Sequence, residues 1–418
     1  MSSAEEALVL EAQSATAGEQ EQGGAFASLR IPSFRWWFVA QIVSGSGTMA
    51  QLVGQAWLVL EVLHGGAVAL GVLSAVAFGP VLLGSAWAGA QLQHLNVRRV
   101  LIGTQVAAGS VAAFSGVLVA TGAIRLWMVF ALAFVNGCVA AFDAPARQLY
   151  VVDLVGRDRV ASAVGLYEVI INASRVVGPA SGGVVLAVAG VPACFFVNAA
   201  SSLVPLIVLL VYRPRHAAAD ASPNQTTRDT LHAGLAYVRR TRAVAACLLM
   251  AAAGCMIFNT GTSIPVIATN TFGLGKVGLG ALTACFGVGA IPGGIAAAYS
   301  RSPHIGPRVR VLCLVSGVAV IAFSCAPVRA AAFPLMMLVG FFSIWMIAQA
   351  NTLVQLRPSA NLRGPVMGLW TMVLPGLMPV AGLITGFATQ YAGARIGYGI
   401  AGVFLCFAAL AGWRALAD

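Results

Sequence analysis

Two charged side chains of opposite sign lie within one long apolar stretch of the sequence, residues 160–188. Glu168, Asn172 and Arg175 follow one another at steps of four and three residues, which places them on one face of a helix. Charges in such a setting are expensive unless they are paired or hydrated, and they often carry protons or bind substrate. We therefore interpret Glu168 as a proton-titratable acid and Arg175 as its counter-charge or a substrate ligand. An ion-pair network that holds one conformation explains the pattern equally well.

A second acid, Asp143, stands near the end of the apolar stretch 124–145. It shares a helical face with Asn136 and with Arg147, which follows one turn later. A helix-end carboxylate paired with Arg147 or Arg175 is favoured over proton carriage, because this position lies near water. Asp143 remains a second candidate for proton coupling.

Five polar side chains follow the first apolar stretch at steps of 3, 4, 3 and 4 residues: Gln41, Ser44, Thr48, Gln51 and Gln55. They share one helical face, and a polar stripe that faced lipid would be costly. Hydrogen bonding between helices is the simpler explanation of such residues. Five residues in register favour a water-filled cavity instead. Gln41, Gln51 and Gln55 are therefore candidate substrate-binding residues, together with Asn172 and Arg175.

No metal or cofactor site is expected from the sequence. The five His residues fall in loops or at the ends of apolar stretches, and the eight Cys residues are scattered singly without a CxxC pair. The Gly-rich segments lack the GK[ST] ending of a Walker A motif, which argues against ATP as an energy source. No nucleophile-elbow motif appears, so the sequence also disfavours an enzyme.

A membrane-embedded helical scaffold must position these side chains. The 418 residues are 59% hydrophobic and only 9% charged, which excludes an ordinary soluble protein and a disordered chain. A bilayer-crossing helix needs about 20 apolar residues. Twelve such segments are predicted, at 34–61, 68–92, 99–120, 124–145, 160–188, 192–212, 243–270, 278–299, 309–327, 330–351, 362–389 and 394–414.

Basic residues are distributed unevenly between the two ends of these spans. Of the 24 Arg and Lys residues, 19 fall on the side that includes the N-terminus, four fall on the opposite side, and Arg175 lies within a span. This is the positive-inside pattern, and it predicts that both termini are cytoplasmic. The net charge of +11 therefore reflects membrane topology rather than nucleic-acid binding.

An internal repeat divides the spans into two sets of six. Residues 164–183 align without gaps with residues 367–386, and both segments are interrupted by Gly and Pro. The predicted fold class is an all-α polytopic membrane protein with twelve transmembrane helices, in two six-helix bundles related by pseudo-two-fold symmetry. The predicted organisation is a disordered acidic tail (1–30), a first bundle (31–212), a cytoplasmic linker (213–242) and a second bundle (243–418).

Several segments carry a resemblance to a known family. FRWWFVAQIVSGSGTMAQLVGQAWLVLEV (34–62), AFDAPARQLYVVDLVGRDRVASAVGL (141–166), NASRVVGPASGG (172–183) and NTLVQLRPSANLRGPVMGLW (351–370) resemble helices one, four, five and eleven of the major facilitator superfamily. More narrowly, they resemble the drug:proton antiporter branch that includes siderophore exporters of the enterobactin type. The resemblance covers roughly residues 30–414 and says little about the substrate.

The resemblance implies a cytoplasmic gate formed by Gly89, Arg98 and Arg99 between the second and third helices, together with Arg147 and Arg363. Two segments depart from the family pattern. The loop reads GAQLQHLNVRR, so that Gln93 and His94 replace the expected Asp and Arg, and Pro365 replaces an Arg before the eleventh helix. A neutral latch would hold the closed cytoplasmic side less firmly.

From these observations we expect a secondary-active exporter in the bacterial inner membrane that works by alternating access. A small amphipathic substrate, most simply a siderophore, would leave in exchange for protons, with outer-membrane or periplasmic export partners as a further option. Three alternatives remain open: a multidrug or antibiotic efflux pump, an importer of the same architecture, and a transport-inactive scaffold or sensor.

Overall fold

The computed structural model describes residues 27–416, except 93–94, 157–159, 213–234, 259, 301–304, 359–365, 367–368, 371 and 374–375. The first half contains α2 (Pro32–Trp57), which continues through a short π-helical turn, η2 (Leu58–Val62), then α3 (Gly66–Gln91), α4 (Val97–Ala120), α5 (Leu126–Val155) and α6 (Val160–Val211). The second half contains α8 (Arg242–Phe258), α9 (Thr260–Val266), η4 (Ile267–Thr271), α10 (Lys276–Tyr299), α11 (Ile305–Ser324), α12 (Arg329–Leu356), α14 (Met378–Ala392) and α15 (Ala394–Ala411).

Local sequence signals account for several helix boundaries. Pro32 occupies the first turn of α2, where its missing N–H costs nothing. Asn96 caps α4, because its side chain accepts a hydrogen bond from the backbone N–H of Arg99 at 3.1 Å. Gly190 interrupts α6 with φ 78° and ψ −177°, a conformation that favours glycine, and it thereby divides the helix into two spans.

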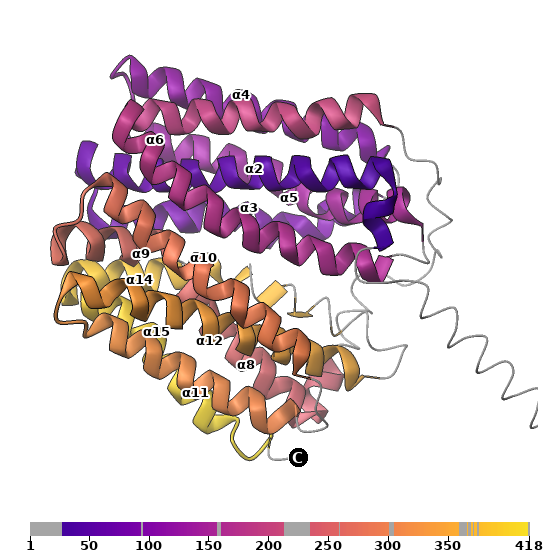
Figure 1. Cartoon of the computed structure of the whole chain (residues 1–418), viewed down its shortest axis with the longest axis vertical. Helices are drawn as coiled ribbons and strands as arrows, with labels where there is room; N and C mark the ends of the chain where they lie inside the picture. Colours follow the sequence, from indigo (N-terminus) through magenta and orange to yellow (C-terminus); the bar gives the residue numbers. More distant parts are fainter. Residues whose placement is uncertain are drawn as a thin grey trace, which may run out of the picture.

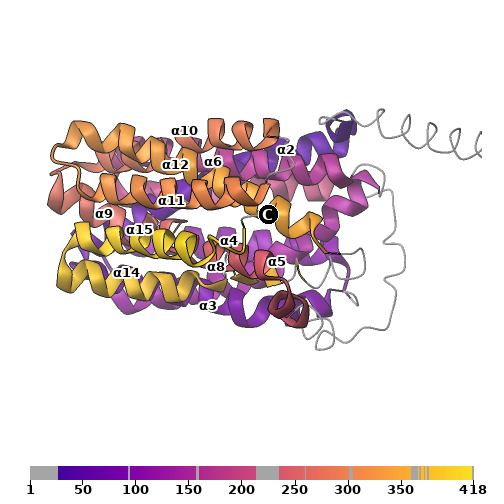
Figure 2. The same ribbon diagram turned by 90° about the horizontal axis from the view of Figure 1, so that it is seen from below.

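The helices form two bundles that lie side by side (Figures 1 and 2). In the first bundle, α2 packs mainly on α6, and α3 packs on α5. In the second bundle, α10 and α11 pack on α12, and α11 also packs on α15. The bundles are joined mainly by two pairs, α6 with α10 and α3 with α14. The start of α2 and the end of the chain lie at one end of the bundles, which we call the terminal end, and we call the other the far end.

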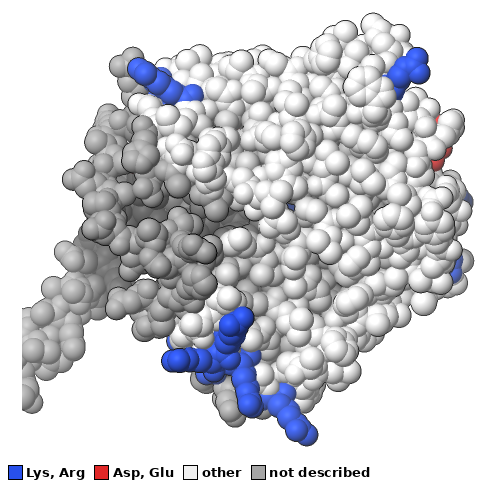
Figure 3. All heavy atoms as spheres, turned by 180° about the vertical axis from the view of Figure 1, so that it is seen from behind, with Lys and Arg blue, Asp and Glu red and all other residues white. Residues whose placement is uncertain are grey.

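The helices match the expectation of a polytopic membrane protein. Within the described residues, nine helical segments are long and apolar enough to cross a membrane, and the Val169–Val211 segment is long enough for two crossings. The helix α2 is absent from this set although it has 26 residues, because its polar stripe lowers its hydropathy. Figure 3 shows the same pattern on one face, since Lys and Arg gather near the ends and the middle is almost entirely uncoloured. The described residues contain helices and no strand, so the predicted all-α fold class is confirmed.

Within the described residues, the two halves share a hydrophobic core at the far end only. One cluster of buried residues includes Leu58 and Leu70 of the first half together with Ile267 and Leu279 of the second. A second cluster, at the terminal end, draws its buried residues from the first half alone: Phe34, Trp37, Ala40, Leu92, Leu101, Ala146, Tyr150, Val151, Leu154, Val155, Ala163, Leu166, Val208 and Leu209. In the described structure, the cores of the halves are therefore separate at the terminal end.

Small residues bring the halves close together at the far end. A Cβ atom built on Gly280 of α10 would lie 2.5 Å from the Cα of Gly183 in α6, and one built on Gly71 of α3 would lie 2.5 Å from the carbonyl oxygen of Gly382 in α14. Only glycine permits backbones to approach this closely. We call these two contacts the far-end seam. Beside it, the backbone N–H of Ala67 donates to Oε1 of Gln390 at 2.9 Å.

Candidate functional site

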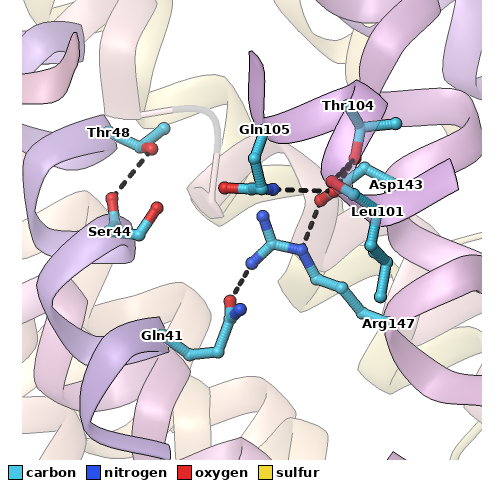
Figure 4. Close-up of polar contacts among 8 residues, drawn as sticks. All are labelled: Gln41, Ser44, Thr48, Leu101, Thr104, Gln105, Asp143 and Arg147. Atoms are coloured by element: carbon cyan, nitrogen blue, oxygen red, sulfur yellow. Dashed lines mark hydrogen bonds and ion pairs between the residues drawn. The ribbon is translucent and has the colours of Figure 1, made fainter. Parts of the chain in front are cut away.

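Five polar side chains from three helices of the first half meet around one ion pair (Figure 4). We call this group the Asp143 cluster: Gln41, Thr104, Gln105, Asp143 and Arg147. Asp143 and Arg147 lie one turn apart on α5 and form an ion pair. Thr104 donates to Oδ1 of Asp143 at 2.7 Å, and Gln105 donates to the same oxygen at 3.0 Å. The pairing of Asp143 with Arg147 that the spacing predicted is therefore confirmed.

The cluster extends to the first helix through Arg147. Its guanidinium donates from Nη1 to Oε1 of Gln41, which is 2% exposed. Because an arginine can only donate, this bond fixes which end of the Gln41 amide faces Arg147. The other end, Nε2, is buried and has no hydrogen-bond partner. The cluster thus ties α2, α4 and α5 together at partly buried charges, with 14% of the Asp143 side chain and 21% of the Arg147 side chain exposed.

The polar stripe of α2 forms hydrogen bonds with two different sets of partners. Gln41 joins the Asp143 cluster, whereas Thr48 donates to Oδ1 of Asn198 at 3.2 Å. Asn198, on the second part of α6, also donates to Oε1 of Gln51 at 2.7 Å. Hydrogen bonding between helices, the simpler of the two explanations, therefore accounts for three of the five stripe residues, Gln41, Thr48 and Gln51. Gln55 is half-buried. Its substrate-binding role, like that of Gln41 and Gln51, stays a prediction.

Arg175 lies between the two halves. Its guanidinium carbon is 5.4 Å from the ring centroid of Phe258, which belongs to α8 of the second half. Phe258 in turn packs edge-on against Phe286 of α10, with ring centroids 5.9 Å apart. The backbone of Glu168 and Asn172 lies in α6, but their side chains are outside the described residues. The predicted interaction of Glu168 with Arg175 therefore stays a prediction.

The predicted gate residues have different surroundings. Arg98 donates from Nε to the carbonyl of Leu209 at 2.7 Å and from Nη2 to the carbonyl of Leu210 at 3.1 Å, so it caps the C-terminus of α6. Arg99 is exposed, and a Cβ atom built on Gly89 would meet open space. Arg363, Gln93, His94 and Pro365 lie outside the described residues. A gating role for this group stays a prediction.

Three partners in these networks were not predicted from the sequence. Thr104 and Gln105 lie in α4, far from Asp143 in the chain, and nothing local links them to it. Asn198 interrupts the apolar run FFVNAASS, and this interruption was a usable signal. Among the described residues, no group of three His, Cys, Asp or Glu side chains could hold a metal ion.

Comparison with known proteins identifies a family and several relatives. Residues 23–416 match the MFS_3 family, described as transmembrane secretion effector. The staphyloferrin A transporter of Staphylococcus aureus (strain NCTC 8325 / PS 47) is 30% identical over 195 residues, which are 46% of this chain and 48% of that protein. This match thus spans about half the length of the staphyloferrin A transporter. Multidrug efflux pump Tap of Mycobacterium tuberculosis (strain ATCC 25618 / H37Rv) is 26% identical over 384 residues, 88% of this chain and 89% of that protein.

Solved structures share the same arrangement of helices. A bacterial homologue of the human lysosomal transporter Spinster, in an inward-facing and occupied conformation, has a TM-score of 0.69 at 15% identity, covering 92% of this chain and 97% of that chain. A bacterial homologue of the iron transporter ferroportin, in an inward-facing state, also has a TM-score of 0.69, at 13% identity, covering 93% and 99%. Identities this low establish the fold alone. Together with the family match, they show that the chain is a polytopic membrane transporter, not an enzyme, and belongs to the transmembrane secretion effector family of the major facilitator superfamily.

Proposed function

We propose that the protein is a secondary-active exporter that carries a small amphipathic molecule out of the cytoplasm by alternating access. One observation carries the proposal. The two bundles share a core and a glycine seam at the far end, whereas their described cores are separate at the terminal end. Two rigid bundles that meet at one end can rock about that contact and expose a central site to each side in turn.

The proposed orientation places the terminal end in the cytoplasm of a bacterial inner membrane. Support comes from the Arg and Lys residues, of which 19 fall on the side of the N-terminus. In this orientation the described cores of the halves are separate on the cytoplasmic side, which supports assignment to an inward-facing state. The state is one in which substrate could enter from the cytoplasm.

A siderophore is the first proposed substrate, because one curated relative at 30% identity transports staphyloferrin A. A multidrug efflux pump is the second candidate. This candidate is favoured by the length of the sequence match, because the match to Tap extends over 88% of this chain and the match to the staphyloferrin A transporter over 46%. The siderophore proposal and the efflux proposal use the same central site and differ only in its occupant.

We propose proton exchange as the driving force, with Glu168 as the titratable group. Arg175 would serve as its counter-charge or as a ligand for substrate, because it lies between the halves beside Phe258. The two hydrogen bonds that Asp143 accepts from Thr104 and Gln105, together with its ion pair with Arg147, support a positioning role for Asp143.

Everted membrane vesicles test the direction of transport. An exporter accumulates substrate in such vesicles when a proton gradient is imposed, whereas an importer does not. Deletion of the gene tests the occupant: loss of iron-chelator activity from spent medium supports a siderophore, and increased drug susceptibility supports efflux. Neither change, with the protein present at normal levels in the parent strain, would support the scaffold or sensor alternative.

Two substitutions test the proposed coupling residues. Glu168→Gln and Arg175→Ala are each expected to abolish accumulation in everted vesicles at normal expression. A matched change outside the site, Arg329→Ala at the far end, is expected to leave it intact. If both Glu168→Gln and Arg175→Ala transport normally, neither residue carries transport.

A further inference from the structure

The second half carries a large positive charge at the terminal end. Residues 230–417 contain twelve Arg and Lys residues and no Asp or Glu, and only three of the twelve, Lys276, Arg329 and Arg395, fall at the far end. Figure 3 shows basic side chains gathered at this corner of the molecule. No acid in that stretch of sequence can neutralise them. The exposed members in the described structure at this end are Arg239, Arg240, Arg242, Arg357 and Arg414.

One part of this surface is built from three packed helices. The segment after α15 crosses from α8 to α11, since Gly412 lies against Ala246 and the carbonyl of Leu416 lies against Gly306. Arg414 therefore stands between the N-terminal turns of α8 and α11. Neither helix has an acid in its first turn, so the positive ends of both helix dipoles add to the charge of the arginine.

The guanidinium of Arg310, in α11, lies over the ring of Trp413 in the same place. Its guanidinium carbon is 4.5 Å from the Trp413 ring centroid, and its Nη1 donates to the Trp413 carbonyl at 3.0 Å. Its Nε–H is buried without an acceptor. The described contacts thus fix the position of the guanidinium and supply no negative charge to balance it.

We propose that Arg310, Trp413 and Arg414 form a binding site for the phosphate of an anionic phospholipid. Clusters of arginine beside the membrane surface attract anionic headgroups, and a guanidinium matches the geometry of a phosphate. A tryptophan at the end of a span lies at the level of the headgroups, and Trp413 is 36% exposed there. The bilayer is therefore the source of the phosphate, and no soluble ligand is needed.

Native mass spectrometry of the full-length protein tests the site. The protein is reconstituted with phosphatidylcholine alone or with added phosphatidylglycerol, and the lipids that it retains are compared. Wild type is expected to retain phosphatidylglycerol selectively. Arg310→Gln/Arg414→Gln is expected to lower the apparent affinity for that lipid by about tenfold or more, as loss of two surface arginines implies. Arg414→Gln alone, at an exposed position, should produce a several-fold loss even if the Arg310 change impairs folding.

Two control variants separate a site from general surface charge. Arg239→Gln/Arg240→Gln removes the same charge at the same end, and Arg329→Gln/Arg395→Gln removes it at the far end of the same half. Both controls are expected to retain phosphatidylglycerol as wild type does. Equal losses in the Arg239/Arg240 and Arg310/Arg414 variants, equal retention of the two lipids, or thermal stabilisation by inorganic phosphate as strong as that by phosphatidylglycerol would each overturn the proposal.

Discussion

The two halves share one helix-capping interaction but differ in where charged side chains lie. In each half, an arginine near the start of the third helix donates to carbonyls at the end of the sixth: Arg98 to Leu209 and Leu210, and Arg310 to Trp413. Within the described residues, the first half holds a partly buried ion pair, that of Asp143 with Arg147. The second half instead buries a neutral amide, Gln349, whose Nε2 donates to the carbonyl of Ala297 at 2.9 Å.

This difference suggests a division of labour between the bundles. Buried charges are costly, and a protein keeps them where a specific geometry or a switch is required. The first half has such a cluster and the proposed coupling acid Glu168, whereas the second half has no acid between residues 230 and 417. We therefore expect the first half to be sensitive to charge changes and the second half to be sensitive mainly to packing.

Removing one partner of the ion pair should have the largest effect. Arg147→Ala leaves the Asp143 carboxylate partly buried and without its counter-charge, which should lower the free energy of unfolding by about 3–5 kcal/mol. Unfolding by a denaturing detergent, followed by helical circular dichroism, measures this loss. The double variant Asp143→Ala/Arg147→Ala should lose clearly less, and an equal loss in the two variants would show that the unpaired carboxylate is not the source of the cost.

A larger residue in the far-end seam should change the fraction of molecules that are closed at the far end, without altering the proposed proton-coupling residues. Gly183→Leu places a side chain where a Cβ atom would already lie 2.8 Å from the Cα of Gly280. Overpacking of this kind costs about 1–3 kcal/mol, so the far end should be closed in a smaller fraction of molecules. Spin labels at Val62 and Val277, both exposed, report this distance. Gly79→Leu is the matched control, because a Cβ atom at Gly79 meets nothing within 4 Å.

The separation of interacting residues along the chain explains which features could be predicted from the sequence. The helical spans were predictable because each apolar run is local, and the ion pair was predictable because Asp143 and Arg147 lie one turn apart. The roles of Thr104 and Asn198 were not predictable, because their partners are distant in the sequence. Thr104 bonds to Asp143, which is 39 residues away, and Asn198 bonds to Thr48, which is 150 residues away. The capping role of Arg98 also depends on a carbonyl 111 residues away, which a loop motif does not reveal.

The hydrogen bond beside the seam should have a moderate effect. Gln390→Ala removes the acceptor of the Ala67 N–H at the start of α3, with a net cost of about 0.5–1.5 kcal/mol to the state that is closed at the far end. The ratio of that state to the open one should therefore fall by about twofold to thirteenfold. The same spin-label pair measures the change. Gln390→Glu, which keeps an acceptor, should restore the wild-type distribution.

The smallest effect is expected in the second half. Gln349→Leu removes one hydrogen bond to Ala297 but also removes Oε1, which is buried without a partner. These changes oppose each other, so the free energy of unfolding should change by less than about 1 kcal/mol. Detergent unfolding beside Arg147→Ala makes the comparison direct. A loss as large as that of Arg147→Ala would contradict the proposed contrast between the halves.

Paired distance measurements test the rocking of the two halves most directly. Spin labels at Val211 and Leu356 report the terminal end, and labels at Val62 and Val277 report the far end. In wild type we predict a short far-end distance and a long terminal-end distance. In Gly183→Leu we predict that the far-end distance lengthens and the terminal-end distance shortens. A far-end distance that lengthens while the terminal-end distance stays fixed, or lengthens with it, would contradict alternating access.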